Sequence, residues 1–395
     1  MNDPIGFLVS ADQPLAGFGP PPPGHRRLLA DCRMLGGHQK EALVSDSGRG
    51  PRTWRFLSDE GKHLKGADEA PFPLGFFNAG LIADLLSHAD AATREACGNA
   101  LTLVNHYWMT GSFIKGDGKG YAEAPTLAVQ AANPGDRDRL AEGLAAAAQG
   151  SLAFRALAAE VAATFSLFVN GKRVALTQLT ESDSPPTDPF QRHTTAPRPA
   201  AGVAALAEII RKTAVVEAGE VQPAPAGTTT RIIRNVTGRA RLGGGQVRTD
   251  TWLELLGVSH FELSAGLDGD ADGQLLPSGL AYLASGVAFC FMTQLSRYIE
   301  HKKFLVDGLR LSQVWDFPTD LKGGPGRIAT HLFLNSKDSD VRCEELMRIA
   351  VRTCYLHATL QTPLQPDIQV RTGSISGDSA TAQTPVAAKK MYGLP

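Results

Sequence analysis

The chain has 395 residues, of which 43% are hydrophobic and 20% are charged, and this composition excludes disorder over most of its length. The formal net charge is −1, which excludes the strong global field that draws proteins onto nucleic acid or an anionic membrane. Five cysteines without a CxxC pair exclude a disulfide scaffold and a zinc ribbon. Because no basic region precedes an apolar run at the amino terminus, we predict no signal peptide and expect a cytoplasmic protein.

In chain order, the predicted elements form two blocks of similar size. Residues 1–24 are rich in Pro and Gly and predict a loose arm. Residues 25–180 predict strands, an apolar helix, two strands, a second helix and a last strand. Residues 181–227 are a Pro-rich linker in which 203–216 has a helical pattern. Residues 228–375 repeat the order β-β-α-β-β-α-β of the first block, which indicates an internal repeat.

Spacing and alternation support this interpretation. The repeat aligns pairs of residues at separations of 206, 207 and 203: Gly80 with Gly286, Trp108 with Trp315, and Ser151 with Cys354. Apolar and polar residues alternate over 247–255, a pattern typical of an antiparallel strand with one buried face. The helix that begins near Pro277 is apolar on nearly all sides and is predicted to be central. Buried helices against antiparallel sheets indicate an α+β layered fold.

Two cysteines of the second block could carry chemistry. Cys290 lies on the predicted central helix, on the same face as Val287. Cys354 follows Arg352 by two residues, and a cationic neighbourhood favours a thiolate. His357, three residues beyond Cys354, could approach the same helical face. The alternative is that both thiols are simply packed in the core, where free cysteines are common.

The segments LLPSGLAYLASGVAFCFMTQL and TCYLHATL resemble the two cysteine motifs of the OsmC/Ohr family. The resemblance implies units in which an antiparallel sheet wraps around two central helices. Family members form intertwined homodimers, so two units in one chain would form an intramolecular pseudo-dimer. The implied chemistry is reduction of organic hydroperoxides, with Cys290 oxidised to a sulfenic acid and Cys354 condensing with it to a disulfide. An external dithiol would be the reductant, and no bound cofactor or metal is implied.

The first block departs from the family at both cysteine positions. Asp84 stands at the position of Cys290, and Ser151 stands at the position of Cys354. This block is therefore expected to have lost thiol chemistry or to have been altered for another role.

The second block departs at the residues that activate the thiol in peroxidase members. These members place a Glu ahead of the reactive cysteine and an Arg nearby, and Leu280 stands where the Glu is expected. The candidates for the arginine are Arg239 and Arg241, or Arg33 from the first block.

Two further motifs are weaker. The segment DGDADG, which begins at Asp268, opens like a calcium loop, but its twelfth position is Gly279 and not Glu, so a solvated turn is predicted. The residues from His106 to Met109 form a polar and aromatic cluster on a predicted strand. Their side chains either pack within the sheet or line a pocket between the blocks together with Asp84.

Three functions remain open at this point. The first is a thiol-dependent peroxidase that acts through Cys290 and Cys354. The second is a hydrolase or carbon–carbon cleaving enzyme with Cys290 as the covalent nucleophile and a histidine as the base. The third is a binding module without catalysis. In each case the expected partner is a small hydrophobic or aromatic molecule, and further homodimerisation is possible.

Overall fold

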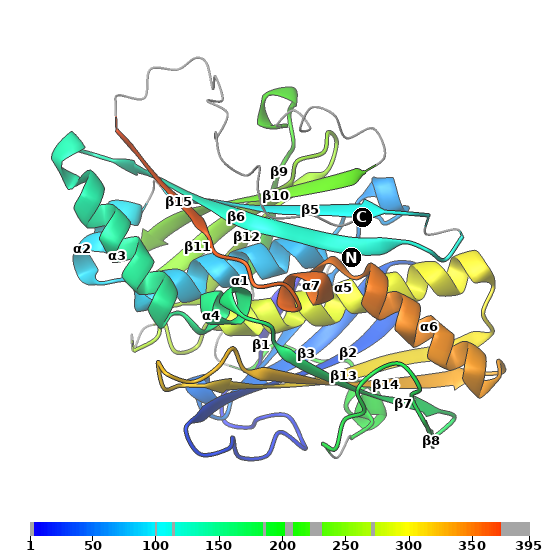
Figure 1. The fold of residues 1–395 in the computed structure, drawn as a ribbon. Coiled ribbons are helices and arrows are strands. Elements are labelled where there is room, and N and C mark those ends of the chain that lie inside the picture. Colours follow the sequence, from blue (N-terminus) through cyan, green and yellow to red (C-terminus); the bar gives the residue numbers. More distant parts are fainter. Residues whose placement is uncertain are drawn as a thin grey trace.

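The computed structural model describes residues 4–98, 101–112, 115–184, 187–201, 208–221, 231–269 and 273–372. Within these ranges the chain forms two sheets with helices between and beside them, which confirms the predicted α+β class (Figure 1).

The sheet at the bottom of Figure 1 has eight strands, and all neighbours are antiparallel except the parallel pair β14 and β7. In spatial order the strands are β1 (Gly6–Ser10), β4 (Thr53–Ser58), β3 (Gln39–Asp46), β2 (His25–Gly36), β13 (Val306–Pro318), β14 (Arg327–Ser336), β7 (Ala162–Val169) and β8 (Lys172–Val174).

The upper sheet has seven strands, with the parallel pair β15 and β6 at one edge. In spatial order the strands are β15 (Asp367–Thr372), β6 (Lys119–Ala131), β5 (Thr102–Thr110), β10 (Ile232–Gly243), β11 (Gln246–Leu253), β12 (Ser259–Gly266) and β9 (Ile210–Val215).

Each sheet contains strands from both blocks of the sequence. The hairpin of β2 and β3 pairs with β13 and β14, whereas β5 and β6 pair with the hairpin of β10 and β11. Exchanging each strand for its counterpart in the other block, and β1 for β9, which precede the two blocks, converts one strand order into the other, apart from the short β8. Residues of both blocks therefore face the same core between the sheets.

Two long helices cross between the sheets and five shorter ones flank them (Figure 1). The helices are α1 (Pro73–His88), α2 (Ala91–Cys97), α3 (Arg137–Gly150), α4 (Leu152–Ala158), α5 (Gly279–Lys302), α6 (Asp340–Thr353) and α7 (Tyr355–Leu360). Short 3-10 helices lie at Ser47–Arg49, Lys62–Leu64, Pro134–Asp136, Pro189–His193 and Ala218–Glu220.

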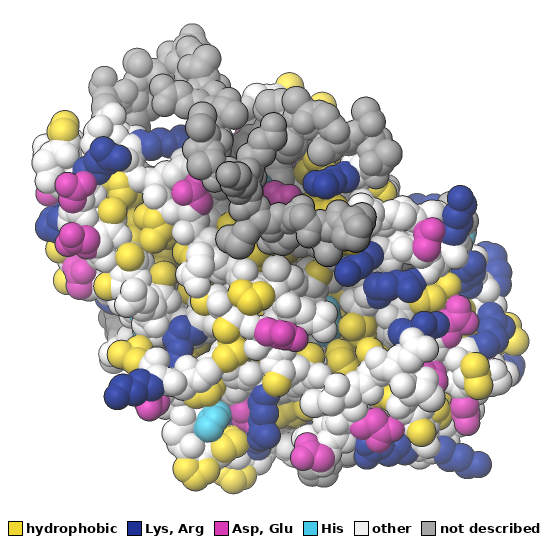
Figure 2. Space-filling view, viewed as in Figure 1, with side chains coloured by type: hydrophobic (Ala, Val, Ile, Leu, Met, Phe, Trp, Pro, Cys, Tyr) yellow, Lys and Arg dark blue, Asp and Glu magenta, His cyan; other side chains and the backbone are white. Residues whose placement is uncertain are grey.

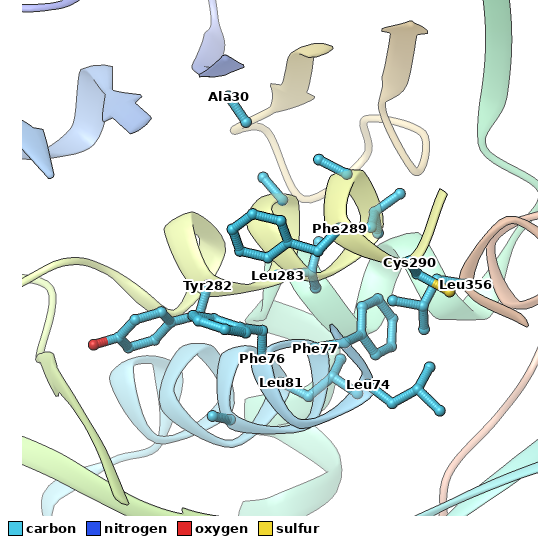
Figure 3. Close-up of a cluster of buried hydrophobic side chains, with 14 of the residues drawn as sticks. Ala30, Leu74, Phe76, Phe77, Leu81, Tyr282, Leu283, Phe289, Cys290 and Leu356 are labelled. Atoms are coloured by element: carbon cyan, nitrogen blue, oxygen red, sulfur yellow. The ribbon is translucent and has the colours of Figure 1, made fainter. Parts of the chain in front are cut away.

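The crossing of α1 and α5 depends on the glycines that the repeat aligned. A Cβ atom on Gly80 would lie 2.6 Å from the backbone nitrogen of Leu283, and one on Gly286 would lie 2.7 Å from that of Phe77. The two contacts are reciprocal, because Gly286 and Leu283 each lie 206 residues after their counterparts, Gly80 and Phe77. Rings from both helices, such as Phe76 and Phe289 at 5.3 Å, fill the space beside the crossing (Figure 3).

Three predicted elements are corrected. Each block has one more strand than predicted; in the second block it is β12, whose residues are buried on both faces and so do not alternate. Residues 1–24 are not all loose, because β1 pairs with β4. The helix predicted at 203–216 is wrong over Ile210–Val215, which is strand β9, while 202–207 lie outside the described residues. The β-branched residues of β9 favour a strand, and its backbone completes the edge of β12.

The predicted alignment of Trp108 with Trp315 is also wrong. Trp315 is completely buried and belongs to the core, whereas Trp108 is half-buried and stacks on Tyr121 outside it, with ring centroids 3.9 Å apart. Tyr107, which precedes Trp108 on β5, is buried. Successive residues of a strand point to opposite faces, so an alignment that is wrong by an odd number of positions exchanges core for surface.

Among the described helices, α5 alone has the length and apolar composition of a membrane span. However, 94% of its most apolar window is buried inside the folded chain, as expected for a core helix. The surface in Figure 2 mixes both signs of charge, in line with the net charge of −1.

Candidate functional site: a buried cysteine pair beside a charged pocket

The fold brings Cys290 and Cys354 into contact. The Cys354 thiol donates a hydrogen bond to the Cys290 sulfur at an Sγ–Sγ distance of 3.2 Å, and both cysteines are free. Cys290 lies in the middle of α5, and Leu356 on α7 lies beside it (Figure 3). The sulfurs must approach by little more than 1 Å to form a disulfide of about 2.05 Å.

Cys354 lies at a break between two helices. Helix α6 ends at Thr353, Cys354 has an extended backbone, and α7 begins at Tyr355. Burial raises the pKa of the Cys354 thiol well above its usual range, and contact with Cys290 raises it further, while the backbone N–H groups of His357 and Leu356 act in the opposite direction. Cys354 is therefore a protonated thiol at neutral pH.

The His357 imidazole packs against aromatic rings and is not among the residues that line the Cys290 pocket. The ring lies between Phe291 and Phe165, with centroids 5.0 and 5.9 Å away, and neither ring nitrogen has a hydrogen-bond partner within the described chain. Burial lowers the pKa of His357 to about 4. Cys354 is the N-cap of α7, and the backbone N–H of His357 in the first turn of that helix acts on its sulfur.

The buried imidazole predicts an acid-sensitive fold. The unfolded chain binds a proton at a pKa near 6.5, so the stability from the neutral imidazole is complete above about pH 6.5 and is lost as the pH falls toward 4. We expect His357→Phe to remove about 2 kcal/mol of the stability difference between pH 7 and pH 4.5, measured by urea unfolding. His301→Gln, at an exposed position, is the control. An unchanged pH dependence in His357→Phe would contradict the burial of a neutral ring.

Only one of the two sulfurs reaches a pocket. Cys290 is 3% exposed and lines a cavity of about 70 Å³, whereas Cys354 is fully buried behind it. The apolar rim of this pocket comes from both blocks and consists of Leu64, Phe72, Pro73, Leu74, Met109, Ile232 and Leu253. A cavity of this size admits a small reactive group, while an attached apolar body would lie across the rim.

Charged and polar groups of the same pocket gather around Cys290. Glu60 follows β4 of the first block, Arg234 lies on β10, and Arg297 lies two helical turns beyond Cys290 on α5. His63 also lines the pocket, and burial lowers its pKa, with a further contribution from Arg234. The pocket of Cys290 therefore holds one carboxyl group, one imidazole and two guanidinium groups.

Tyr107 and Tyr355 enclose the sulfurs from the side of β5 and α7. Their rings are 5.8 Å apart, and Tyr355 lines the pocket. Burial raises the pKa of Tyr107 well above its usual range, and the sulfurs of Cys290 and Cys354 add to this shift. The site is therefore built from β5 and the Glu60 segment of one block and from α5, α7 and β10 of the other.

The structure does not place the predicted arginines at this pocket. Arg239 lies over the ring of Trp252 at 4.7 Å, and Arg241 is exposed and 4.0 Å from Glu262. Arg33 is 2.8 Å from Glu41. None of the three lines the Cys290 pocket, and Arg234 and Arg297 are the arginines that do.

Asp84 and Ser151 form a second pair at the equivalent place in the first block. Ser151 donates a hydrogen bond to Asp84 Oδ2 at 2.6 Å, and the backbone N–H of Ala153 donates to the same oxygen at 2.9 Å. Both side chains are buried. The Asp84 carboxylate thus holds the first turn of α4 in place. At the equivalent position, the second block has the sulfurs of Cys290 and Cys354.

His106 is not part of either pair. Its ring nitrogens lie 3.2 Å from Asn235 Oδ1 and 3.2 Å from Thr126 Oγ1, on strands β10 and β6. Of the cluster predicted around it, Met109 does line the Cys290 pocket.

The start of the DGDADG segment makes ion pairs with arginines. Asp268 lies 2.5 Å from Arg26 and 2.9 Å from Arg49, whereas residues 270–272 lie outside the described part of the chain. Asp268 therefore serves an ion-pair network within the described structure.

Sequence reasoning missed Glu60, Arg234, Arg297 and His63. Two signals were available. Arg297 is seven residues from Cys290, which places it on the same face of one helix. Arg234 has the strand parity of the buried Val236, whereas Arg239 has the opposite parity. Nothing local pointed to Glu60 or His63, which sheet pairing brings from the other block.

Comparisons with known proteins agree with these motifs. Residues 269–369, which include both cysteines, match the family model described as OsmC-like protein. No curated protein matches the chain. Among solved structures, the chain is similar to an OsmC-like hydroperoxide resistance protein from Jannaschia sp. CCS1. The identity is 23%, covering 32% of this chain and 83% of that chain, with a TM-score of 0.19. The resemblance is thus confirmed as an OsmC-like domain at 269–369, and the first unit of the tandem stays a prediction.

Proposed function

We propose that the chain reduces organic hydroperoxides, with Cys290 as the attacking thiolate and Cys354 as the resolving thiol. The observation that carries the proposal is the contact of the two sulfurs at 3.2 Å, of which only Cys290 opens to a pocket. The Glu that the sequence lacks ahead of Cys290 has a substitute in Glu60, and Arg234 and Arg297 supply the cations.

In the first step, the Cys290 thiolate attacks the terminal oxygen of the hydroperoxide ROOH and the O–O bond breaks. The sulfur is oxidised to a sulfenic acid, and the leaving alkoxide takes up the proton that Cys290 had released, giving ROH. In this proposal Glu60, which lines the pocket, accepts a hydrogen bond from the hydroperoxyl group, whose hydrogen stays on the transferred oxygen, and the guanidinium groups stabilise the developing alkoxide charge.

In the second step, the Cys354 thiol condenses with the sulfenic acid, forming a disulfide and releasing water. An external dithiol then reduces the disulfide, returns both thiols and becomes a disulfide itself. The net reaction converts ROOH and a dithiol into ROH, water and the oxidised dithiol. The protonated state of Cys354 suits this order, because it withholds the second thiolate until Cys290 has been oxidised.

We also propose that residues 25–180 and 228–375 are two units of one intramolecular pseudo-dimer, joined by the 181–227 linker. The interchangeable strand orders and the reciprocal glycine contacts support this arrangement. The pair of Asp84 and Ser151 would then be the second site of the dimer, converted from redox chemistry to holding α4 in place.

The alternative of a cysteine hydrolase draws support from His63. It is the histidine among the residues that line the Cys290 pocket, and burial lowers its pKa, so that it is neutral and able to accept a proton. Such an enzyme would not consume thiols in the presence of a hydroperoxide.

Thiol counting tests the proposal. One equivalent of cumene hydroperoxide should lower the number of thiols titrated after denaturation by two of the five. Cys354→Ser should lose only the Cys290 thiol and yield a sulfenic acid that dimedone traps. If all five thiols persist, hydroperoxide reduction is ruled out. Rapid alkylation of Cys290 would then favour the hydrolase, and slow alkylation would favour a binding module.

A further inference from the structure

A fully buried lysine, Lys40 on β3, lies behind the Cys290 pocket. Its Nζ donates hydrogen bonds to Thr293 Oγ1 at 2.8 Å and to Glu60 Oε1 at 3.3 Å. The Thr293 hydroxyl donates to the same Oε1 at 2.5 Å. Glu60 and Thr293 line the pocket, whereas Lys40 does not. Lys40 therefore reaches the site only through these two side chains.

The equivalent position in the other sheet is apolar. Lys40 pairs with Met34 across the β2–β3 hairpin, and Val247 pairs with Leu242 at the same place in the β10–β11 hairpin. Val247 is fully buried. The fold therefore accepts an aliphatic side chain here, and packing alone does not require an ammonium group. The charged residue thus occurs in the β2–β3 hairpin, from which it contacts Glu60 and Thr293 of the Cys290 pocket.

The two donors, Lys40 and Thr293, also fix the orientation of Glu60. Both side-chain hydrogen bonds that Glu60 accepts end on Oε1, which is held from β3 and from α5. Thr293 is one helical turn beyond Cys290, so the carboxylate is anchored to the helix that carries the nucleophile. Among the described residues, the side-chain donors to this carboxylate are Lys40 and Thr293, and neither of them donates to the second oxygen, Oε2.

We propose that Lys40 is a positioning residue for the reaction above: it keeps Glu60 ionised and oriented so that Oε2 accepts a hydrogen bond from the hydroperoxyl group. The inference rests on the proposed function. A carboxylate in a largely dry pocket is unfavourable without a cation and takes up a proton instead. A protonated Glu60 would offer a hydrogen where the substrate needs an acceptor.

Several other charged or titratable groups face the pair of Lys40 and Glu60. They are His38 and Cys32 from the β2–β3 hairpin, His63 from the segment after β4, Cys290, Arg297 and Glu300 on α5, and Arg234 on β10. The experiment must therefore separate an effect through Glu60 from an effect on these groups.

The test compares pH profiles of Cys290 oxidation by cumene hydroperoxide in a single turnover. Lys40→Met should move the acid limb of the profile upward by about 1 to 3 pH units, because a neighbouring opposite charge shifts a carboxyl by that amount. Lys40→Arg should restore the wild-type limb. Val247→Met, a substitution at the equivalent place in the β10–β11 hairpin, should leave the profile unchanged.

Two results would overturn the role of Lys40. One is a Lys40→Met profile identical to the wild type with only a lower urea midpoint, which would make the lysine purely structural. The other is a further shift when Lys40→Met is added to Glu60→Gln, which would show that Lys40 acts without Glu60.

A readout without peroxide separates this inference from the proposed function. The infrared carbonyl band of protonated Glu60, assigned by its loss in Glu60→Gln, should appear at higher pH in Lys40→Met than in the wild type. If that band moves while the wild type consumes no thiols, the proposed function fails and the ionisation of Glu60 by Lys40 stands. A band that does not move contradicts the inference, even in an active peroxidase.

Discussion

Cys290→Ser is expected to lower the rate of cumene hydroperoxide reduction by about a thousand-fold or more. A serine hydroxyl is not ionised near neutral pH and cannot replace a thiolate as the attacking group. Cys354→Ser should behave differently and complete the first oxidation without forming the internal disulfide. The measurement is consumption of hydroperoxide with a small dithiol, such as dithiothreitol, as the reductant.

Cys97→Ser is the matched control for this prediction. Cys97 is also buried, and burial raises its pKa to about 12, but it lies on α2 and does not line the Cys290 pocket. It should lower stability without lowering turnover. Activity that survives in Cys290→Ser and is lost in Cys97→Ser would contradict the assignment of the nucleophile.

Gly80→Ala is expected to destabilise the protein by about 2 to 3 kcal/mol, despite a gain of about 1 kcal/mol in helix propensity. The added Cβ would lie 2.6 Å from the backbone nitrogen of Leu283 and 2.7 Å from the carbonyl oxygen of Gly279. Backbone atoms of a packed helix cannot rotate away as the end of a side chain can. Gly286→Ala should have a similar effect, because its Cβ would meet the backbone of α1. Urea unfolding at neutral pH measures both.

Gly135→Ala is the control for this crossing. A Cβ at Gly135 would meet nothing within 4 Å, so a change within about 0.5 kcal/mol is expected. Equal urea midpoints for the wild type, Gly80→Ala and Gly286→Ala would contradict the close approach of the two helices.

Features set within one helix or by one repeat could be predicted from the sequence. The central position of α5 follows from its apolar faces, and the repeat aligned Gly80 with Gly286, the two glycines at which the central helices approach each other. The pairing of Cys290 with Cys354 came from two motifs on helices that had to pack together.

The errors have separate physical causes. His357 was expected to approach Cys354 on one helical face, but its ring packs against Phe291 and Phe165. Arg239 was one candidate from a predicted strand-turn region, and strand alternation turns it away from the core. Glu60 and Lys40 approach Cys290 only because strands of the first block cover the helix of the second, and no local pattern encodes that.

The sharing of sheets between the blocks has a consequence for biosynthesis. Strand β2 pairs with β13, which begins 270 residues after β2 ends. At about 5 to 20 residues per second, a ribosome needs roughly 15 to 50 s to supply that partner. During this time the nascent amino-terminal half carries open strand edges, which can pair with a neighbouring nascent chain as readily as with its own later half.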